Sequence, residues 1–283
     1  MPNVNSDRLN RREAIEFLGL EEKTFDNYFK NAEEFSALPR EGRGRFYFNK
    51  AELSEWLDDY RWRTVTLDRE DYRLCLDFAL AQHIRGYVTS DWGSGRQREF
   101  GQKLTNWIKG QLAEVALKKF LKDEFGREVE LDFEIHKEFV PQDIVAVIED
   151  GTKRDPNLRV GVKSSKPKNA YLVLSENEVV REDRKSDVYV FCRPDIPDDH
   201  LLRLTRDVII EEVKDQQHFG FYGSHIPEFQ PIPCEIAGFC YIRDLGNPVK
   251  EIPGQEFSGL RYVCQTGKLR RSRKDWEKLA SKL

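Results

Sequence analysis

The sequence predicts a mixed α/β (α+β) protein, in which a sheet flanked by helices follows a small helical module. Apolar residues recur at helical spacing in the first sixty positions, and a strong amphipathic pattern spans residues 106–121. Short apolar runs of strand length follow, at 144–148, 158–162, 188–192 and 236–241. A chain of 283 residues is long enough for two domains, each with its own core. We expect one domain over 1–62 and a second over 63–283.

The composition indicates a globular protein with a heavily solvated surface. Hydrophobic residues make up 39% of the chain and charged residues 34%. The longest apolar runs are far shorter than a membrane span, and the N-terminus has no apolar signal segment. Five cysteines without CxxC spacing fit reduced thiols, and five histidines form no metal or HNH-type pattern. These features predict a cytoplasmic protein that does not associate with membranes.

Basic residues are concentrated in three segments although the net charge is −4. Residues 153–168 contain six basic side chains and one acidic one, and residues 266–283 contain seven basic and two acidic. Residues 40–50 contain four basic side chains and Glu41. Solvated loop charge would explain any one segment, but three of them favour a polyanion bound at defined places.

The N-terminal segment predicts helix, turn, helix, hairpin and helix. The sequence RREAIEFLGL (11–20) has one apolar helical face and ends at Gly19, and EEKTFDNYFKNAEEF continues at helical spacing. A Gly/Arg-rich turn and an aromatic strand (46–48) precede a helix capped by Asn49.

This order resembles the winged helix-turn-helix of the excisionase and MerR-like DNA-binding families, over about residues 9–58. The resemblance implies that the second helix lies in the major groove and the wing reaches the backbone or minor groove. It implies DNA contacts from Lys23, Thr24, Asn27 and Lys30 on that helix, and from Arg43 and Arg45 on the wing. The alternative is a structural or protein-binding helical domain.

A helical connector is expected over 63–105. The stretch RLCLDFALAQHI (73–84) predicts a helix, and a Gly/Ser turn after it exposes Arg96 and Arg98 as further DNA contacts. We assign this connector to the second domain.

Three residues of the second domain suggest a site. Glu114 lies on the flank of the apolar stripe of the helix, Asp143 stands before the strand IVAVI, and Lys163 ends the strand LRVGVK. We expect the two strands to pair antiparallel across the turn EDGTKRDPN, which would bring Asp143 and Lys163 to one end of the sheet. Each residue alone could be an ordinary surface charge or turn cap.

A helix Glu, a strand Asp and a strand Lys in this order resemble the PD-(D/E)xK nuclease superfamily. PQD at 141–143 is similar to its PD element, and GVK at 161–163 occupies the place of (D/E)xK. The following helix and strand in LSENEVVREDRKSDVYVFCRP resemble elements of restriction endonucleases. The resemblance covers about 105–245 and implies a restriction-endonuclease-like core.

The resemblance implies hydrolysis of phosphodiester bonds with Mg²⁺. Asp143 would be the central ligand, with the backbone carbonyl of Val162 beside it. Lys163 would orient or deprotonate the attacking water and offset charge in the transition state. We expect a depressed pKa for this lysine beside a metal in a partly dry cleft.

Gly161 departs from the pattern, because the superfamily has an acid there. In one interpretation Glu114 supplies the second carboxylate, with Glu176 and Glu178 as reserves. In the other, the site is degenerate and the domain only binds DNA. We prefer the first. Further DNA contacts are expected from six residues after the strand and near the C-terminus: Ser164, Ser165, Lys166, Lys168, Arg270 and Arg271.

The sequence therefore predicts a type II restriction endonuclease that cuts double-stranded DNA at a short site and leaves 5′-phosphate ends. It implies a homodimer on two-fold symmetric DNA and a cognate methyltransferase outside any stable complex. One alternative is a DNA-binding regulator with a degenerate nuclease domain. Another is a repair or modification-dependent nuclease, for which four tryptophans in the first half could supply an aromatic cage: Trp56, Trp62, Trp92 and Trp107.

Overall fold

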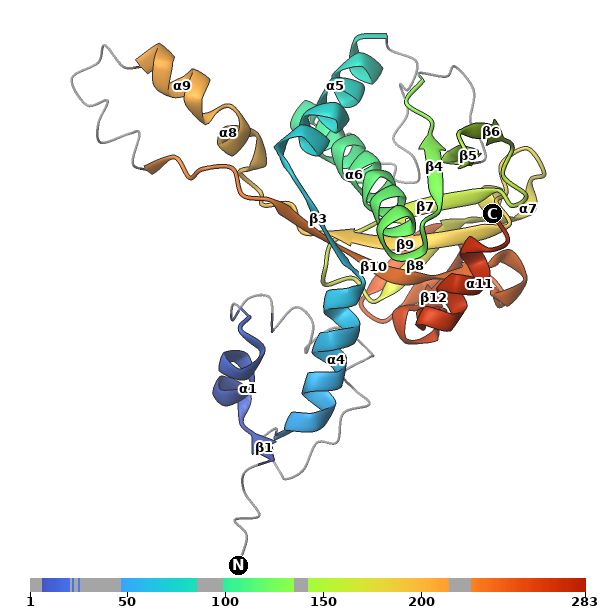
Figure 1. Cartoon of the computed structure of the whole chain (residues 1–283), viewed down its shortest axis with the longest axis horizontal. Helices are drawn as coiled ribbons and strands as arrows, with labels where there is room; N and C mark the ends of the chain where they lie inside the picture. Colours follow the sequence, from blue (N-terminus) through green and yellow to red (C-terminus); the bar gives the residue numbers. More distant parts are fainter. Residues whose placement is uncertain are drawn as a thin grey trace, which may run out of the picture.

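The computed structural model describes residues 7–20, 22, 25, 47–85, 99–134, 142–213 and 225–283. Mixed α/β architecture is confirmed, with a four-stranded sheet at its centre (Figure 1). The described part has the following elements before the central helix: β1 (Arg8–Leu9), α1 (Arg11–Leu18), β2 (Phe48–Asn49), α4 (Lys50–Trp62), β3 (Thr64–Leu67) and α5 (Arg69–Arg85).

The site-bearing elements follow. They are α6 (Phe100–Phe125), β4 (Glu128–Leu131), β5 (Ile144–Glu149), β6 (Thr152–Arg154), β7 (Val160–Ser164), β8 (Tyr171–Ser175), α7 (Glu176–Val180) and β9 (Val188–Pro194). The chain ends with α8 (His200–Leu204), α9 (Arg206–Val213), β10 (Ile232–Tyr241), η1 (Ile242–Asp244), β11 (Val249–Ile252), β12 (Gln255–Gln265), η2 (Thr266–Lys268) and α11 (Arg273–Ala280).

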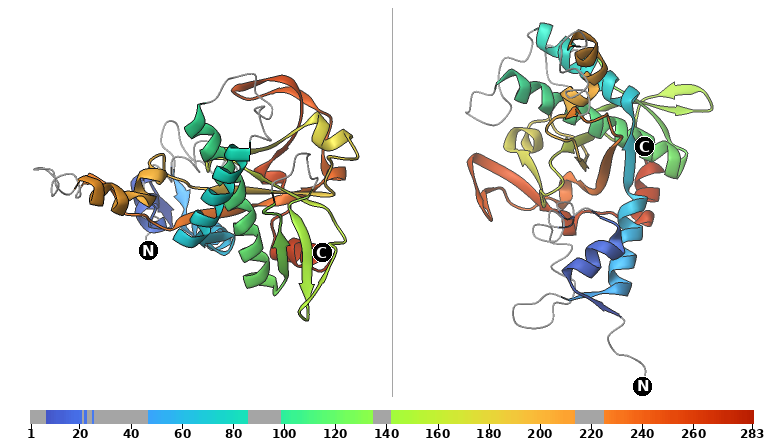
Figure 2. Two further views of the ribbon diagram at one scale, coloured as in Figure 1. Left: turned by 90° about the horizontal axis from the view of Figure 1, so that it is seen from above. Right: turned by 90° about the vertical axis from the view of Figure 1, so that its left-hand side faces the viewer.

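The N-terminal module has a small core of its own. Helix α1 begins with a capping box at Asn10 and ends at Gly19 in the left-handed conformation, as its sequence predicts. Asn49 caps α4, also as predicted. Phe25 and apolar side chains from α1, β2 and α4 meet there (Ala14, Leu18, Phe48, Leu53 and Leu57). Figure 2 shows this module joined to the larger body by α4. The segment expected to form the wing lies outside the described residues, so the winged helix-turn-helix stays a prediction.

The central sheet has the strand order β3-β10-β9-β7, and β7 forms one edge. Strand β7 runs parallel to β9, whereas β10 is antiparallel to both of its neighbours. Side chains alternate across β9: Val188, Val190 and Cys192 belong to the core that includes α6, while Tyr189 and Phe191 belong to the core that includes β8. The sheet is therefore covered by helices on one face and by β8 and the β11–β12 hairpin on the other.

The sheet expected from 144–163 differs from the observed one. Strand β5 pairs with β4 and with the short β6, which occupies part of the predicted turn. The simple antiparallel hairpin of β5 and β7 is therefore wrong. The chain turns back within 150–151, where Asp150 and Gly151 have positive φ angles, and the β5–β6 hairpin projects from the body (Figure 2).

A buried ion triad ties α4 to the sheet. Glu235 on β10 accepts from Arg63 Nη1 at 3.0 Å and from Arg193 Nη2 at 2.6 Å, and all three side chains are at most 3% exposed. Burial acts to raise the pKa of Glu235, but the two guanidinium groups outweigh it and the pKa lies below the ordinary value. Trp62, at the end of α4, packs against Phe120 and donates to Glu124 Oε2 at 2.7 Å. The last turn of α4 thus belongs to the large core.

We expect Glu235→Gln to lower the free energy of unfolding by about 3–5 kcal/mol at pH 7, because two buried guanidinium groups lose the carboxylate between them and Arg63 keeps only its pair with the more exposed Asp59. The folded-state pKa is depressed, so this stabilisation is present above the unfolded pKa of about 4.3 and is lost as the pH falls through the folded value. The difference between variant and wild type should therefore shrink in acid. Urea unfolding followed by circular dichroism at neutral and acidic pH measures it.

Glu256→Gln is the matched control, because Glu256 is an exposed carboxylate on β12. It should change the unfolding free energy by less than about 0.5 kcal/mol. An effect of Glu235→Gln that is equally small, or that is independent of pH, would contradict the assigned role of the triad.

Candidate active site at the edge of the central sheet

Asp143 forms hydrogen bonds with the edge of β7 that does not pair with β9. The Asp143 N–H donates to the Val160 carbonyl at 2.9 Å, and the Val162 N–H donates to Asp143 Oδ2 at 2.5 Å. The N–H and C=O groups of a strand residue lie on the same edge of the strand, so the Val162 carbonyl also faces this side. Asp143 therefore lies against the strand that carries Lys163, although the two predicted strands do not form a hairpin.

Lys163 is paired with a carboxylate from α7. Its Nζ lies 2.6 Å from Glu178 Oε1, and the two side chains are 28% and 21% exposed. Glu178 Oε2 accepts from the backbone N–H and the hydroxyl of Ser175, at 2.9 and 2.7 Å. Glu178 thus holds Lys163 in place. The S-x-x-E spacing of a capping box at 175–178 is the sequence signal for this inward-turned glutamate.

Helix α6 supplies Glu114 and Gln111 from a stretch that is buried on every side. Glu114 is 7% exposed and Gln111 8%, and Gln111 Nε2 donates to Glu114 Oε1 at 3.0 Å. Gln111 Oε1 is buried without a hydrogen-bond partner. A buried carboxylate beside an orphaned amide oxygen is costly without a compensating partner, so it marks a polar site rather than core packing.

The charges of these residues interact. Burial is the main cause that raises the pKa of Glu114 well above its ordinary value, and the negative charge of Asp143 adds to it. Burial likewise raises the pKa of Asp143, against the opposing effects of Lys163 and the Val162 N–H. The charge of Lys163 therefore acts on both carboxylates, while its direct ion-pair partner is Glu178.

The expected depression of the Lys163 pKa is not found. Burial acts to lower it, but Glu178 and then Asp143 outweigh burial, and the pKa of Lys163 lies above its ordinary value. The carboxylate of Glu178 shows the matching effect: burial opposes ionisation, yet Lys163 and Ser175 bring the pKa below the ordinary value. Lys163 is therefore a protonated donor in this arrangement.

Asp132 is an acid that the sequence analysis missed. It directly follows β4, its N–H donates to the Asp143 carbonyl at 3.3 Å, and its charge raises the pKa of both Asp143 and Glu114. The feature of the sequence that could have identified Asp132 is the position of an acid directly after a strand. Of the two reserves, Glu178 belongs to the cluster through Lys163, whereas Glu176 is exposed on α7.

Steric crowding explains why position 161 has no side chain. A Cβ atom there would lie 2.6 Å from Ser186 Oγ and 3.2 Å from Tyr189 Cδ1. Ser186 N–H donates to the Tyr189 hydroxyl at 3.0 Å, and that hydroxyl donates to the carbonyl of Glu178. Ser186 and Tyr189 therefore fill the space that a side chain at position 161 would need, and Tyr189 supports the helix that carries Glu178.

The oxygen atoms of the cluster fit a hard divalent cation only in part. Within the described ranges, no three His, Cys, Asp or Glu side chains form a group that could hold a metal ion. Mg²⁺ needs fewer protein ligands than that, since it commonly takes one or two carboxylates together with substrate phosphates and water. The repulsion between Glu114 and Asp143 and the orphaned Gln111 Oε1 are what such a cation would relieve. Asp143, Glu114 and the Val162 carbonyl are the residues that would hold it.

Eight of the expected DNA contacts lie outside the described residues: Lys23, Thr24, Asn27, Lys30, Arg43, Arg45, Arg96 and Arg98. The Ser164 backbone ends β7, the Ser165 hydroxyl accepts from Asn169, and Lys166 and Lys168 are exposed. Arg270 pairs with Asp244 at 2.9 Å, and its backbone bridges to Phe239 beside the half-buried Arg271.

The basic segment 153–168 is largely neutralised by neighbours. Lys153 pairs with Glu130, Arg154 with Glu149, and Arg159 with Asp187. Among the described residues of this segment, Lys166 and Lys168 are therefore the basic side chains that no ion pair neutralises.

Three of the tryptophans considered for an aromatic cage have other packing roles, and one of them, Trp107, packs against the large core. Trp56 stacks on Tyr60, and Trp62 packs in the large core, while Trp92 lies outside the described residues. None of the helices over the described residues has the length and apolar character that crossing a membrane requires.

Comparison with protein-family models, curated proteins and solved structures finds no match to this chain.

We expect Gly161→Ala to lower the free energy of unfolding by about 1–3 kcal/mol, because a methyl group would press on the buried Ser186 and Tyr189. Gly259→Ala on β12 is the control: the nearest atom to its Cβ would be Arg261 Nη1 at 3.6 Å, an ordinary contact. Denaturant unfolding of both variants provides the measurement. Equal stability of the two variants would show that the space at position 161 is not filled as described.

Proposed function

We propose that this protein is a Mg²⁺-dependent endonuclease that cleaves double-stranded DNA at a short specific sequence, in the manner of a type II restriction enzyme. The observation that supports the proposal is that Asp143 is bonded to the edge of β7, and that its charge and that of Lys163 act on the buried Glu114. Buried carboxylates with raised pKa values near a lysine are typical of sites that hydrolyse phosphodiester bonds.

The roles follow from the environment of each residue. When bound, Mg²⁺ would polarise the scissile phosphate and lower the pKa of a water ligand. Asp143 and Glu114 would hold it, together with the Val162 carbonyl. Lys163, protonated and fixed by Glu178, would donate to a phosphoryl oxygen and offset the charge that develops in the transition state. Glu178 is a positioning residue, because it would affect the reaction only by holding Lys163 in place.

The wider assignment extends this proposal. Cleavage to 5′-phosphate ends, action as a homodimer on two-fold symmetric sites and protection of the host by a cognate methyltransferase are parts of it. The N-terminal module would help to read the duplex. A restriction-endonuclease-like core is supported by the order α6, β5, β7, α7, β9 and by the parallel pairing of β7 with β9.

A DNA-binding regulator with a degenerate nuclease domain is the second candidate. Glycine at position 161, with Ser186 and Tyr189 in the space that a side chain would need, favours it. Digestion of methylated and unmethylated phage DNA, with Mg²⁺ or with a chelator, separates the candidates. Discrete fragments that require Mg²⁺ support the restriction enzyme, cutting only of methylated DNA supports a modification-dependent nuclease, and intact DNA supports the regulator.

We expect Asp143→Asn and Lys163→Met to lower the cleavage rate at least about 10²-fold, since each removes a charge that acts on the transition state. Lys153→Met is the matched control, because Lys153 is an exposed lysine on β6 paired with Glu130. Single-turnover cleavage of plasmid DNA measures the rates, and circular dichroism checks the fold. Cleavage by Lys163→Met at the full rate would remove Lys163 from the mechanism.

Glu178→Gln should lower the rate by about tenfold, less than loss of the lysine, because Lys163 keeps its charge but loses its fixed position. In the Lys163→Met background the same change should have no further effect on the rate, as expected for a residue that acts through Lys163. Glu176→Gln, on the exposed side of α7, is the control. Additive losses in the double variant would instead give Glu178 an independent role.

A further inference from the structure

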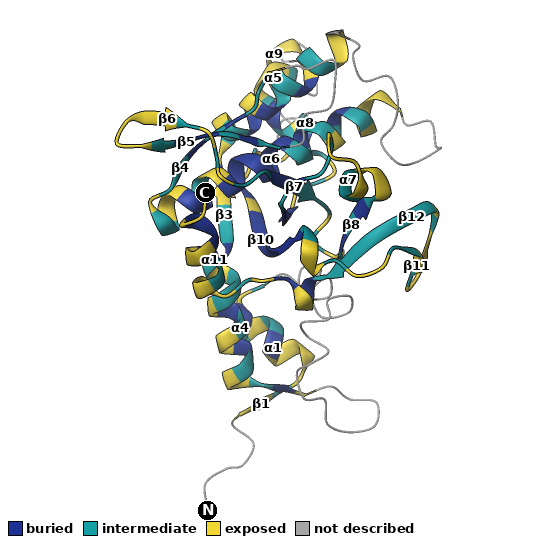
Figure 3. Cartoon of the chain, turned by 90° about the vertical axis from the view of Figure 1, so that its right-hand side faces the viewer, coloured by how far each residue is buried: buried dark blue, intermediate teal, exposed yellow. Residues whose placement is uncertain are grey.

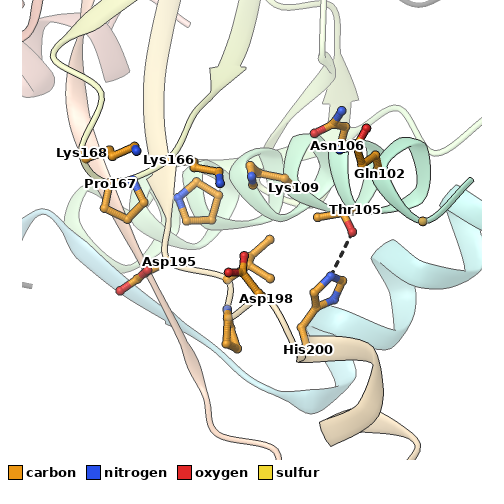
Figure 4. Close-up of a pocket in the computed structure, with 14 residues that line it drawn as sticks. Gln102, Thr105, Asn106, Lys109, Lys166, Pro167, Lys168, Asp195, Asp198 and His200 are labelled. Atoms are coloured by element: carbon orange, nitrogen blue, oxygen red, sulfur yellow. Dashed lines mark hydrogen bonds between the residues drawn. The ribbon is translucent and has the colours of Figure 1, made fainter. Parts of the chain in front are cut away.

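A pocket of about 610 Å³ lies beside the candidate active site. One wall is a face of α6, which contributes Gln102, Thr105, Asn106 and Lys109 (Figure 4). The other walls come from the segment that follows β7, with Lys166, Pro167 and Lys168, and from residues 194–198 after β9. Helix α6 thus contributes to both the pocket and the site, and a second wall of the pocket comes from the segment shortly after β7.

The pocket continues the site along α6 and along β7. Lys109 precedes Glu114 by five residues, which is about 7.5 Å along a helix axis at 1.5 Å per residue. Lys166 follows Lys163 by three residues, just beyond the strand end. Successive nucleotides of one strand rise about 3.4 Å in a duplex, so the pocket lies within one to a few nucleotides of a phosphate at Lys163.

Positive charge gathers at one end of the pocket. Lys109 and Lys166 lie near each other in Figure 4, and no ion pair joins either amine to a described residue. Burial lowers the pKa of half-buried Lys109, and the charge of Lys166 lowers it further against the opposing effect of Asp198. Two crowded amines without a bound carboxylate would be stabilised by an anion such as a phosphate.

The other end has different chemistry. Asn106 and Gln102 present amide groups from α6 there, whereas the carboxylate of Asp198 lies opposite α6 and nearer to Lys109, on whose charge it acts (Figure 4). Amides and carboxylates are the side chains that pair with base edges, and a carboxylate accepts from an exocyclic amine. Prolines and one isoleucine supply apolar wall surface against which a base or sugar can pack (Pro167, Pro194, Ile196 and Pro197).

Buried hydrogen bonds fix the walls. His200, at the start of α8, bonds through Nε2 to Thr105 Oγ1 on α6 at 3.0 Å and through Nδ1 to the Tyr72 hydroxyl on α5. His200 is 3% exposed and Tyr72 is fully buried. The segment after β9 is therefore held to two helices, and the pocket is formed before any ligand binds.

We propose that this pocket receives a single nucleotide of the DNA strand, unstacked from the duplex next to the scissile phosphate. Its phosphate would lie at Lys109 and Lys166, and its base edge would face Asn106, Gln102 and Asp198. The inference rests on the proposed nuclease function. The pocket offers lysines to one phosphate and amide groups to one base edge, and a base inside a duplex would have to leave the stack to reach them.

Mononucleotide binding to the full-length protein tests the proposal directly. Isothermal titration in the presence of a chelator compares dCMP with deoxycytidine, inorganic phosphate and dTMP. We expect dCMP to bind at least tenfold more tightly than deoxycytidine or phosphate, and more tightly than dTMP, which lacks an exocyclic amine. Lys109→Gln and Lys166→Gln should each weaken dCMP binding at least tenfold. Lys118→Gln, on the same helix but lining a different hollow, should not change it.

Phosphate binding as tight as dCMP binding would overturn the proposal and leave a simple anion site. Unchanged dCMP binding in both lysine variants would overturn it as well, and equal binding of dCMP and dTMP would remove the base contact assigned to Asp198. Asp143→Asn separates the two proposals, because it should abolish cleavage yet bind dCMP normally. A protein that binds dCMP through Lys109 but never cuts DNA would sink the nuclease function alone. One that cuts DNA without binding dCMP would sink the pocket alone.

Discussion

The contact of Asp143 with the edge of β7 is the constraint on which the candidate site depends. An edge strand has unpaired N–H and C=O groups, and here one aspartate satisfies two of them, through its own N–H and its carboxylate. These two hydrogen bonds hold the start of β5 against β7, although the two strands do not form a continuous series of backbone hydrogen bonds. They also place the Asp143 carboxylate near Lys163, on the edge of β7 that the Val162 carbonyl faces. The site is thus a consequence of how the sheet edge is closed.

Two groups of buried charge in this protein have different uses. Glu235 is enclosed between Arg63 and Arg193, and each of its oxygens has a partner, so the triad is satisfied and structural. In the cluster around β7, burial and then the charge of Asp143 raise the pKa of Glu114, and Gln111 keeps an oxygen without a partner. Like charges buried near one another destabilise a folded protein. Such groups are typical of sites where a bound ligand neutralises them. This contrast distinguishes the candidate site from the rest of the core.

Most elements of the larger domain could be predicted because local pattern and burial agree. The helix over 106–121, the strands at 144–148 and 188–192 and the capped helix after Asn49 all form where the sequence indicates. The predicted pairing of β5 with β7 is wrong because strand pairing depends on residues far apart in the sequence. Three residues of the predicted turn, Thr152–Arg154, form a strand of their own and pair with β5 in place of β7. The depressed pKa of Lys163 failed for a similar reason, since Glu178 is fifteen positions away in sequence and next to it in space.

The sequence by itself determined which residues are chemically unusual: an acid within an apolar helix, an aspartate at a strand start, a lysine at a strand end and a glycine where an acid was expected. Spacing and polarity are local, so they can be read from the chain. Only the tertiary structure decided that Tyr189 fills the space beside Gly161, that Asp132 and Glu178 join the cluster, and that α6 and the segment after β7 enclose a pocket next to it. Those facts depend on contacts between distant segments, which no local pattern specifies.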